Sequence, residues 1–287
     1  MTVSNRLNQA KAFIDRQPGA KYTVSSVAAL THLSPYHFHR LWKARFGVPL
    51  LKYITHARLR RSASQLAYRQ HLSITEIAFE AGYESPEAYS RAFSRQYGTS
   101  PRTFRQAPDF SITLPPDNTQ PQRTTIVSDN YELTLEHRHA VPLAVMRHEG
   151  SPTGLPGTIQ RFIAWRKANK LPPPRFRTFN LLYDDPRNVA PHAFRFDLCC
   201  EVPPHINIAD HEEVSFKTLP QGRFACVTVS GSDNNLEPAI EWLYSNWLVN
   251  SDYQPADFPL IIERRTFYPD VSGDDVKTDI LLALSES

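Results

Sequence analysis

The sequence predicts a multidomain chain in which an all-α domain precedes an α+β domain. Apolar side chains recur at helical spacing almost throughout residues 1–107, and alternating strand patterns begin near residue 131. The charge divides at the same place: residues 1–107 hold 16 Lys and Arg against 5 Asp and Glu, net +11, and the rest hold 16 against 24, net −8. A chain of 287 residues is long enough for two domains of about 100–200 residues each.

Residues 108–130 are rich in Pro, Asn, Gln, Ser and Thr and show little periodicity. We therefore predict domains at residues 1–107 and 131–287, joined by a Pro-rich linker. The concentration of positive charge in the first domain is typical of a domain that contacts a polyanion.

The basic half contains an internal duplication at a constant offset of 51 residues. The pattern Ser-Pro-x-x-Phe-x-Arg-x-Trp-x-x-x-Phe-Gly at residues 34–47 recurs as Ser-Pro-x-x-Tyr-x-Arg-x-Phe-x-x-x-Tyr-Gly at residues 85–98. Each copy begins with a Ser that can cap the helix and a Pro suited to its first turn, and each ends with Gly. The two segments are predicted to be helices of the same design.

A shorter apolar helix is predicted before each of these, at residues 25–29 and 74–81. Two short helices joined in this way form a helix-turn-helix, whose second helix enters the major groove of DNA. The helical spacing leaves these side chains outside the core, on the DNA-reading face: Tyr36, His39, Arg40 and Lys43 in the first unit, and Glu87, Ser90 and Arg91 in the second.

Residues 50–69 contain no Gly or Pro and predict one connecting helix. At 1.5 Å per residue it spans roughly 30 Å, close to the ~34 Å turn of B-DNA, so a monomer could place both recognition helices in successive grooves. Arg58, Arg60 and Arg61 on this helix are predicted to contact phosphates.

The segments SPYHFHRLWKARFG, YITHARLRRSASQLA and IAFEAGYESPEAYSRAFSRQYGTSPRTFR resemble the AraC/XylS family of transcription regulators over about residues 5–106. The resemblance implies double-stranded DNA as the partner and assigns the two sets of outward side chains to two successive grooves. His32 stands where the family often has Gly; we expect a small stability cost, because His tolerates a left-handed backbone. Alternatively, Arg40 and Arg91 are phosphate contacts or ion-pair partners of Glu84 or Glu87.

The acidic half reads as two similar sets of strand, helix and strands, which predicts a pseudo-symmetric α+β domain with its helices on one side of an antiparallel sheet. Helices are predicted at residues 158–169 and 236–248. Strands are predicted at residues 131–139, 142–148, 178–183, 192–202, 213–218, 223–229, 260–267 and 278–284.

The segments LAVMRHEG, TIQRFIAWRKAN, LLYDDP, FRFDLCCEV, LPQGRFACVTVSG, LEPAIEWLYSNWL and FPLIIERRTFYPD resemble the GyrI-like effector-binding domain over roughly residues 130–285. Regulators with an AraC-type domain followed by a GyrI-like domain are a known arrangement. The resemblance implies that residues 131–287 bind a small effector, of cationic or amphipathic character.

Glu263 is the central residue of this prediction. It lies in a predicted strand whose two faces are both partly apolar, so its carboxylate is expected to be partly buried and to need a partner. The resemblance places a Glu at this position at the bottom of an aromatic pocket, whose walls could be Trp165, Tyr183, Trp242 and Phe267. The alternative is that Glu263 pairs with Arg265 or another Arg and that the aromatic residues are ordinary core.

Two other functions remain open for the acidic half. Some GyrI-like proteins hydrolyse small molecules, and Glu263 could act as a general base, but the sequence shows no nucleophile, phosphate loop or cofactor fingerprint. We therefore expect no enzyme activity and no cofactor. Alternatively, the domain contacts a protein such as gyrase or RNA polymerase.

Other features exclude several classes of protein. No apolar run is long enough to span a membrane and no secretory signal precedes the first helix, so we expect a cytoplasmic protein. The scattered His137, His139 and His148 and the three Cys, at 199, 200 and 226, do not have the spacing of metal ligands, and the cysteines are predicted to be core residues. The operator, the oligomeric state, and whether the protein activates or represses are not determined by the sequence.

Overall fold

The structure is a computed structural model that describes residues 2–108, 131–173, 175–187, 189–203, 212–267 and 275–285. The chain divides into two compact units, Met1–Thr124 and Thr125–Ser287, and each is described by itself. The predicted linker, residues 108–130, lies outside the described residues except for Pro108.

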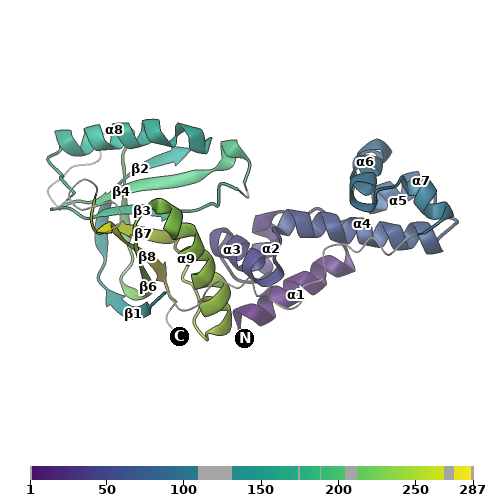
Figure 1. Cartoon of the computed structure of the whole chain (residues 1–287), viewed down its shortest axis with the longest axis horizontal. Coiled ribbons are helices and arrows are strands. Elements are labelled where there is room, and N and C mark those ends of the chain that lie inside the picture. The colour runs from purple at the N-terminus through teal and green to yellow at the C-terminus, as the bar shows by residue number, and fades with distance from the viewer. Residues whose placement is uncertain are drawn as a thin grey trace. The chain divides into compact units, whose positions relative to one another are not determined.

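The described part of the first unit is entirely helical, as predicted (Figure 1). Helices α2 and α3 form the first helix-turn-helix, α5 and α6 form the second, and the 19-residue helix α4 connects them. The bounds are α1 (Val3–Arg16), α2 (Val24–Leu30), α3 (Pro35–Phe46), α4 (Leu50–Tyr68), α5 (Ile74–Glu80), α6 (Pro86–Tyr97) and α7 (Pro101–Gln106).

The ends of the duplicated helices follow the predicted design with one exception. Gly47 and Gly98 end α3 and α6 in the left-handed conformation, with φ of 74° and 69°. The Ser85 hydroxyl accepts the backbone N–H of Ala88 at 3.2 Å and caps α6. The prediction is wrong for Ser34, whose hydroxyl is buried and makes no capping hydrogen bond, because the side chain faces the interior.

The turn of each helix-turn-helix contains one left-handed residue. His32 has φ of 51° in the first turn, and Gly82 has φ of 77° in the second. His32 therefore adopts the conformation that the sequence predicted for it, although glycine would adopt this conformation with less strain.

Both helix-turn-helix units pack on the central helix. In the second helix-turn-helix, the cluster that includes Tyr89 and Phe93 of α6 is buried against Leu59, Ala63 and Leu66 of α4. This packing positions α6 relative to one end of α4.

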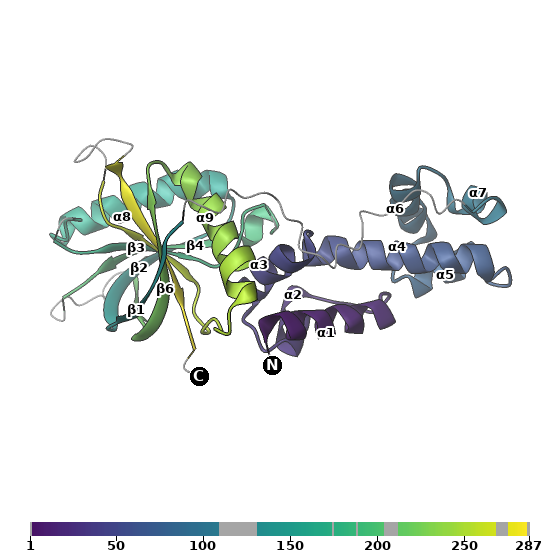
Figure 2. The same ribbon diagram turned by 60° about the horizontal axis from the view of Figure 1, so that its bottom comes forward.

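The second unit is an antiparallel sheet with the strand order β1-β6-β8-β7-β3-β4-β2-β5 (Figure 2). The bounds are β1 (Leu133–Arg138), β2 (Val141–Glu149), β3 (Thr178–Leu182), β4 (Arg195–Glu201), β5 (Ser215–Leu219), β6 (Gly222–Ser230), β7 (Leu260–Arg264) and β8 (Lys277–Ala283). The strand predicted to end at residue 267 ends at Arg264, whose partner on β8 is Thr278. Beyond it, Arg265 and Thr266 donate their backbone N–H groups to the same carbonyl, that of Lys277, so the regular pairing stops.

The described residues of this domain include two α-helices beside the sheet, α8 (Leu155–Ala168) and α9 (Leu236–Trp242). The helix predicted at residues 236–248 changes after Trp242 into a π-helical turn, Leu243–Trp247, and a 3₁₀ turn, Leu248–Asn250. The element order confirms two sets of two strands, one helix and two strands. In each set the first strand pairs with the opposite set, β1 with β6 and β5 with β2.

The two faces of the sheet carry separate cores. One face packs against α8 through a cluster that includes Phe162, Met146 and Leu198, and α9 packs on β6 and β8. The other face buries a cluster to which neither helix contributes. The members of this second cluster are Val141, Leu143, Val145, Phe179, Leu181, Cys199, Leu219, Phe224, Cys226, Ile261, Leu281 and Ala283.

Candidate functional site

The two predicted DNA-reading faces differ in exposure. On α6, Glu87 and Arg91 are exposed and Ser90 is half-buried. On α3, all four of the predicted residues are half-buried: Tyr36, His39, Arg40 and Lys43. The roles of these seven side chains in reading bases remain predictions.

The three arginines predicted to contact phosphates all make contacts within the first unit. Arg60 forms an ion pair with Asp15 at 3.3 Å. Arg61 donates to the carbonyl of Arg16 at 3.0 Å. Arg58 donates from Nε and Nη2 to two carbonyl oxygens of the loop between α1 and α2. The structure therefore shows a structural contact for each, and their contact with DNA remains a prediction.

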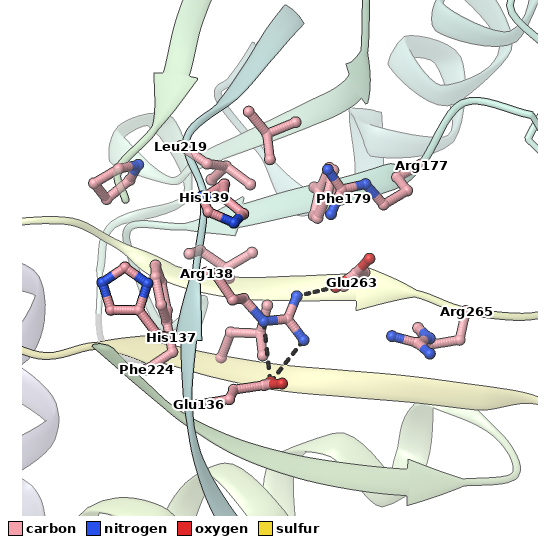
Figure 3. A pocket seen from close by; sticks show the side chains of 14 residues that line it. Glu136, His137, Arg138, His139, Arg177, Phe179, Leu219, Phe224, Glu263 and Arg265 are labelled. Atoms are coloured by element: carbon pink, nitrogen blue, oxygen red, sulfur yellow. Dashed lines mark hydrogen bonds and ion pairs between the residues drawn. The ribbon is translucent and has the colours of Figure 1, made fainter. Parts of the chain in front are cut away.

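A cavity of about 320 Å³ opens on the sheet face that the helices do not cover (Figure 3). The residues that line it come from every strand except β4, so the sheet curls around it. Its apolar lining consists of Val141, Phe179, Leu219, Pro220, Phe224, Ile261 and Leu281. Its polar lining consists of Glu136, His137, Arg138, His139, Arg177, Glu263 and Arg265.

Glu263 lies in this cavity and is 2% exposed. Strand β7 places it between two central strands of the sheet, where its neighbours across the ladder are Phe179 and Asp279. A buried carboxylate needs a partner to remain charged. The guanidinium of Arg138 donates a hydrogen bond to it, as the dashed line in Figure 3 shows.

Arg138 joins two carboxylates across the cavity. Besides Glu263, it binds Oε1 of Glu136 through Nε at 3.0 Å and Nη2 at 2.8 Å. Asp279 lies further from it, with 3.7 Å between Nη2 and Oδ2. Arg138 stands on β1, an edge strand that pairs only with β6 among the described strands, and it extends from there toward β7.

The charges of this cluster shift the pKa values of its members. Burial alone would lower the pKa of Arg138, but hydrogen bonds and charge from Glu263 and Glu136 outweigh it and raise the pKa. Burial alone would raise the pKa of Glu136, but the hydrogen bonds and charge of Arg138 lower it. Burial, assisted by nearby Asp279 and Glu136, raises the pKa of Cys226 to about 12, so this thiol stays protonated near neutral pH.

The structure does not assemble the four predicted aromatic walls around Glu263. Trp165 packs against the α8 cluster, on the opposite face of the sheet. Tyr183 is on the same face as Glu263 but donates its hydroxyl to Asp197 at 2.8 Å. Trp242 packs against Tyr131, with ring centroids 5.5 Å apart.

Phe267 is half-buried, beyond the end of β7, and is not among the lining residues. Phe179 and Phe224 are the aromatic residues that do line the cavity. The prediction of one pocket walled by the four named aromatic residues is therefore not supported, because these side chains belong to different faces and elements.

Sequence reasoning missed Arg138, Glu136 and the two phenylalanines. One signal was present: Glu136 and Arg138 are two residues apart in a predicted strand and therefore share a face. Nothing in the local pattern shows that this strand joins β6, which brings Arg138 to a carboxylate 125 residues away.

The described residues contain no cluster of three or more His, Cys, Asp or Glu side chains that could hold a metal ion. All three cysteines are free and buried, as predicted. Among the helices that the structure describes, none has the length and apolar character needed to cross a membrane.

Both compact units are similar to known proteins. Residues 131–285 match the family model of the GyrI-like small molecule binding domain, and residues 27–107 match a helix-turn-helix domain model. The chain is similar to the probable transcriptional regulator YgiV of Escherichia coli K12, at 29% identity over 147 residues, which are 51% of this chain and 91% of that protein.

Another relative is the HTH-type transcriptional regulator AlkR of Acinetobacter baylyi, at 37% identity over 100 residues, 35% of this chain and 32% of that one. Among solved structures, the DNA-binding domain of AdpA in complex with a target DNA matches at 26% identity, with a TM-score of 0.34. The match covers 36% of this chain and 91% of that one.

A duplicated helix-turn-helix followed by a sheet domain with a charged cavity defines a class of DNA-binding proteins that carry their own small-molecule receptor. The chain belongs to the GyrI-like small molecule binding family through its second unit, and its first unit is an AraC-type helix-turn-helix domain. This combination is that of a transcription regulator, as the named relatives are.

Proposed function

We propose that this regulator responds to an amphipathic organic cation that binds beside Glu263. The observation that carries the proposal is the ion pair of Glu263 with Arg138, in which a side chain from an edge strand supplies a cation to a buried carboxylate. A ligand cation would take the place of this guanidinium. Glu136, which also binds Arg138, would become the second carboxylate partner of the ligand cation.

The net charge around the cavity supports a cation over an anion. Each guanidinium in the lining has a carboxylate partner: Arg138 pairs with Glu136 and Glu263, Arg177 with Glu201 at 2.9 Å, and Arg265 with Asp279 at 3.3 Å. The lining itself holds three guanidinium groups and two carboxylates, and Glu201 and Asp279 outside it pair with two of these guanidinium groups. With these partners included, four carboxylates surround three guanidinium groups, and the excess is negative. A second anion would add to this excess, and a cation would neutralise it.

The apolar lining supports a ligand with a hydrophobic part. Phe179, Leu219 and Phe224 offer apolar surface in the same cavity as the carboxylates. Aromatic faces also attract a cation within about 6 Å. Arg177 already lies 5.5 Å from the ring centroid of Phe179, and Phe224 is a second aromatic residue of the lining.

Isothermal titration calorimetry of the full chain with phenylbutyltrimethylammonium and phenylbutanesulfonate tests this proposal, because the two ions share an apolar tail and differ in the sign of their charge. We expect saturable binding of the ammonium ion only. Glu263→Gln should weaken it about tenfold or more, since it removes the buried charge. Equal binding of both ions, or no effect of Glu263→Gln, would contradict the proposal. No binding of either would favour a protein partner such as RNA polymerase.

We also propose that α3 and α6 read the two parts of the DNA site through the seven predicted side chains, with domains at residues 1–107 and 131–287. The exposure of Glu87 and Arg91 on α6 supports this assignment. Arg91→Ala should cost about 1–3 kcal/mol on the selected sequence and relax the preference for one base pair. An equal loss on all sequences would assign Arg91 to a phosphate instead.

We further propose that the chain acts without catalysis and in the cytoplasm. The support is that the named relatives are transcription regulators and that Glu263, the candidate base, is already bound to Arg138. A hydrolysis assay with the ligand that binds most tightly checks the first point.

A further inference from the structure

We propose that Gly19, Arg58 and Gly82 lock the two helix-turn-helix units together and thereby determine which spacing between half-sites the regulator accepts. This inference rests on the proposed reading of DNA by α3 and α6. It concerns a different property, the distance and angle between the two helices.

The first component is a backbone contact between the units. Gly19 belongs to the loop at residues 17–23, between α1 and α2, and Glu80 and Gly82 belong to the end of α5 and the turn before α6. A Cβ on Gly19 would lie 2.0 Å from the carbonyl oxygen of Glu80. A Cβ on Gly82 would lie 2.4 Å from the carbonyl oxygen of Gly19. The two backbone segments can approach this closely only because both positions lack a side chain.

The second component is the side chain of Arg58, from the middle of α4. Its Nε donates to the carbonyl of Pro18 and its Nη2 to the carbonyl of Ala20, both at 2.9 Å. These two carbonyls flank Gly19. A Cβ on Gly82 would lie 3.2 Å from the same guanidinium, so Arg58 also lies beside the turn of the second helix-turn-helix.

The end of α5, in the second helix-turn-helix, is also anchored to α4. The amide of Gln65 donates to the side chain of Glu80 at 2.6 Å. The central helix therefore binds the loop between α1 and α2 through Arg58, and the end of α5 through Gln65. Between these two anchors the backbones of Gly19 and Gly82 meet.

The mechanical consequence follows from the number of connections. Long helices are rarely straight, so a connection through α4 alone would leave the two helix-turn-helix units some freedom to move relative to each other. A second contact away from the helix axis removes this freedom, because bending or twisting α4 would have to separate Gly19 from Glu80. With about 10–10.5 base pairs per turn of 34–36 Å, each added base pair shifts a half-site by about 3.4 Å and rotates it by about 35°. A rigid pair of recognition helices cannot follow that displacement.

Arg58 is therefore a positioning residue. This role is separate from the phosphate contact that the sequence predicts for Arg58, and it rests on the hydrogen bonds that Nε and Nη2 donate to the loop. Arg61 offers a matched control. It stands on the same helix and carries the same charge, but it donates to the carbonyl of Arg16 at 3.0 Å. Arg16 is the last residue of α1, outside the contact between Gly19 and Gly82.

The test uses the full chain and a DNA duplex selected by it from a randomised library. Dissociation constants are measured by fluorescence anisotropy on this duplex and on duplexes with one base pair added or removed between the two half-sites. For the wild type we expect a loss of about 30-fold or more on the altered spacings, since one helix then loses its base contacts. Gly19→Ala and Arg58→Ala should reduce this loss to about fivefold or less. Arg61→Ala should keep it at the wild-type value.

Three results would overturn the inference: a wild type that tolerates the altered spacings, an Arg58→Ala variant that discriminates as the wild type does, or an Arg61→Ala variant that loses discrimination equally. If Gly19→Ala does not fold, Arg58→Ala carries the test alone. The ratio between spacings separates this role from a general loss of stability, which would lower all affinities together. Failure of the proposed DNA reading would appear differently, as unchanged base preference in Arg91→Ala.

Discussion

The ion pair of Arg138 with Glu263 leads to the most specific prediction about the receptor domain. The side chain of Glu263 is 3% exposed and that of Arg138 is 18% exposed. Replacing Arg138 with Met keeps an unbranched apolar stem and removes the guanidinium group, so Glu263 loses its cation inside the protein. Removing one partner from a buried pair typically costs about 3–5 kcal/mol. Because Arg138 retains some exposure, we expect the lower part of this range, about 3 kcal/mol.

Urea unfolding followed by tryptophan fluorescence measures this loss, because Trp165, Trp242 and Trp247 all lie in the second unit. The double variant Arg138→Met with Glu263→Gln should recover most of the stability, since the unpaired charge is then gone. A coupling energy of about 2 kcal/mol or more between the two positions would agree with the pair seen in the structure.

The same variant has an opposite effect on ligand binding. With the internal guanidinium removed, an organic cation no longer competes for Glu263, so Arg138→Met should bind phenylbutyltrimethylammonium about tenfold more tightly than the wild type. A variant that is as stable as the wild type and binds no more tightly would refute the role assigned to Arg138.

Three further predictions concern stability and reactivity. Burial opposes ionisation of Asp197, but hydrogen bonds and charge from Arg147 and Lys217 lower the pKa of this carboxyl group. Its ionised form therefore stabilises the folded protein above the ordinary pKa of 3.8, and this stabilisation is lost as the pH falls below that value. In urea unfolding, Asp197→Asn should lower the free energy of unfolding at pH 7 and lower it less at pH 3. His32→Gly should raise stability by about 0.5–1 kcal/mol in thermal unfolding, since φ of 51° strains His; a lower midpoint would contradict this. Because burial raises the pKa of Cys200 to about 11 and that of Cys226 to about 12, iodoacetamide at pH 8 should modify the cysteines only after denaturation.

Local patterns predicted most of the first unit. The repeated Ser-Pro and Gly signals mark helix ends through interactions between neighbouring residues, and the spacing of apolar residues marks each buried face. The departure at Ser34 shows the limit of such signals. The sequence identifies a residue able to cap a helix, but the packing around it decides whether the hydroxyl meets a backbone N–H.

The site of the second unit was predicted in part. The alternation of polar and apolar residues placed Glu263 in a buried strand, and the structure confirms its burial. The partner was left open between Arg265 and another Arg, and the structure shows Arg138. The aromatic lining could not be inferred, because Phe179 and Phe224 line the same cavity only when strands of the two sets curl around it.

The sequence by itself determined the two-domain order, the duplicated DNA-binding unit, the position of the central helix and the burial of Glu263 in a strand, because each depends on periodicity, charge or motifs within short segments. Only the tertiary structure decided which residues meet across long separations. Strand β1 crosses to the opposite set and delivers Arg138 to Glu263, and Arg58 reaches the loop around Gly19. Such contacts depend on strand exchange and on close backbone approach, and neither leaves a periodic trace in the sequence.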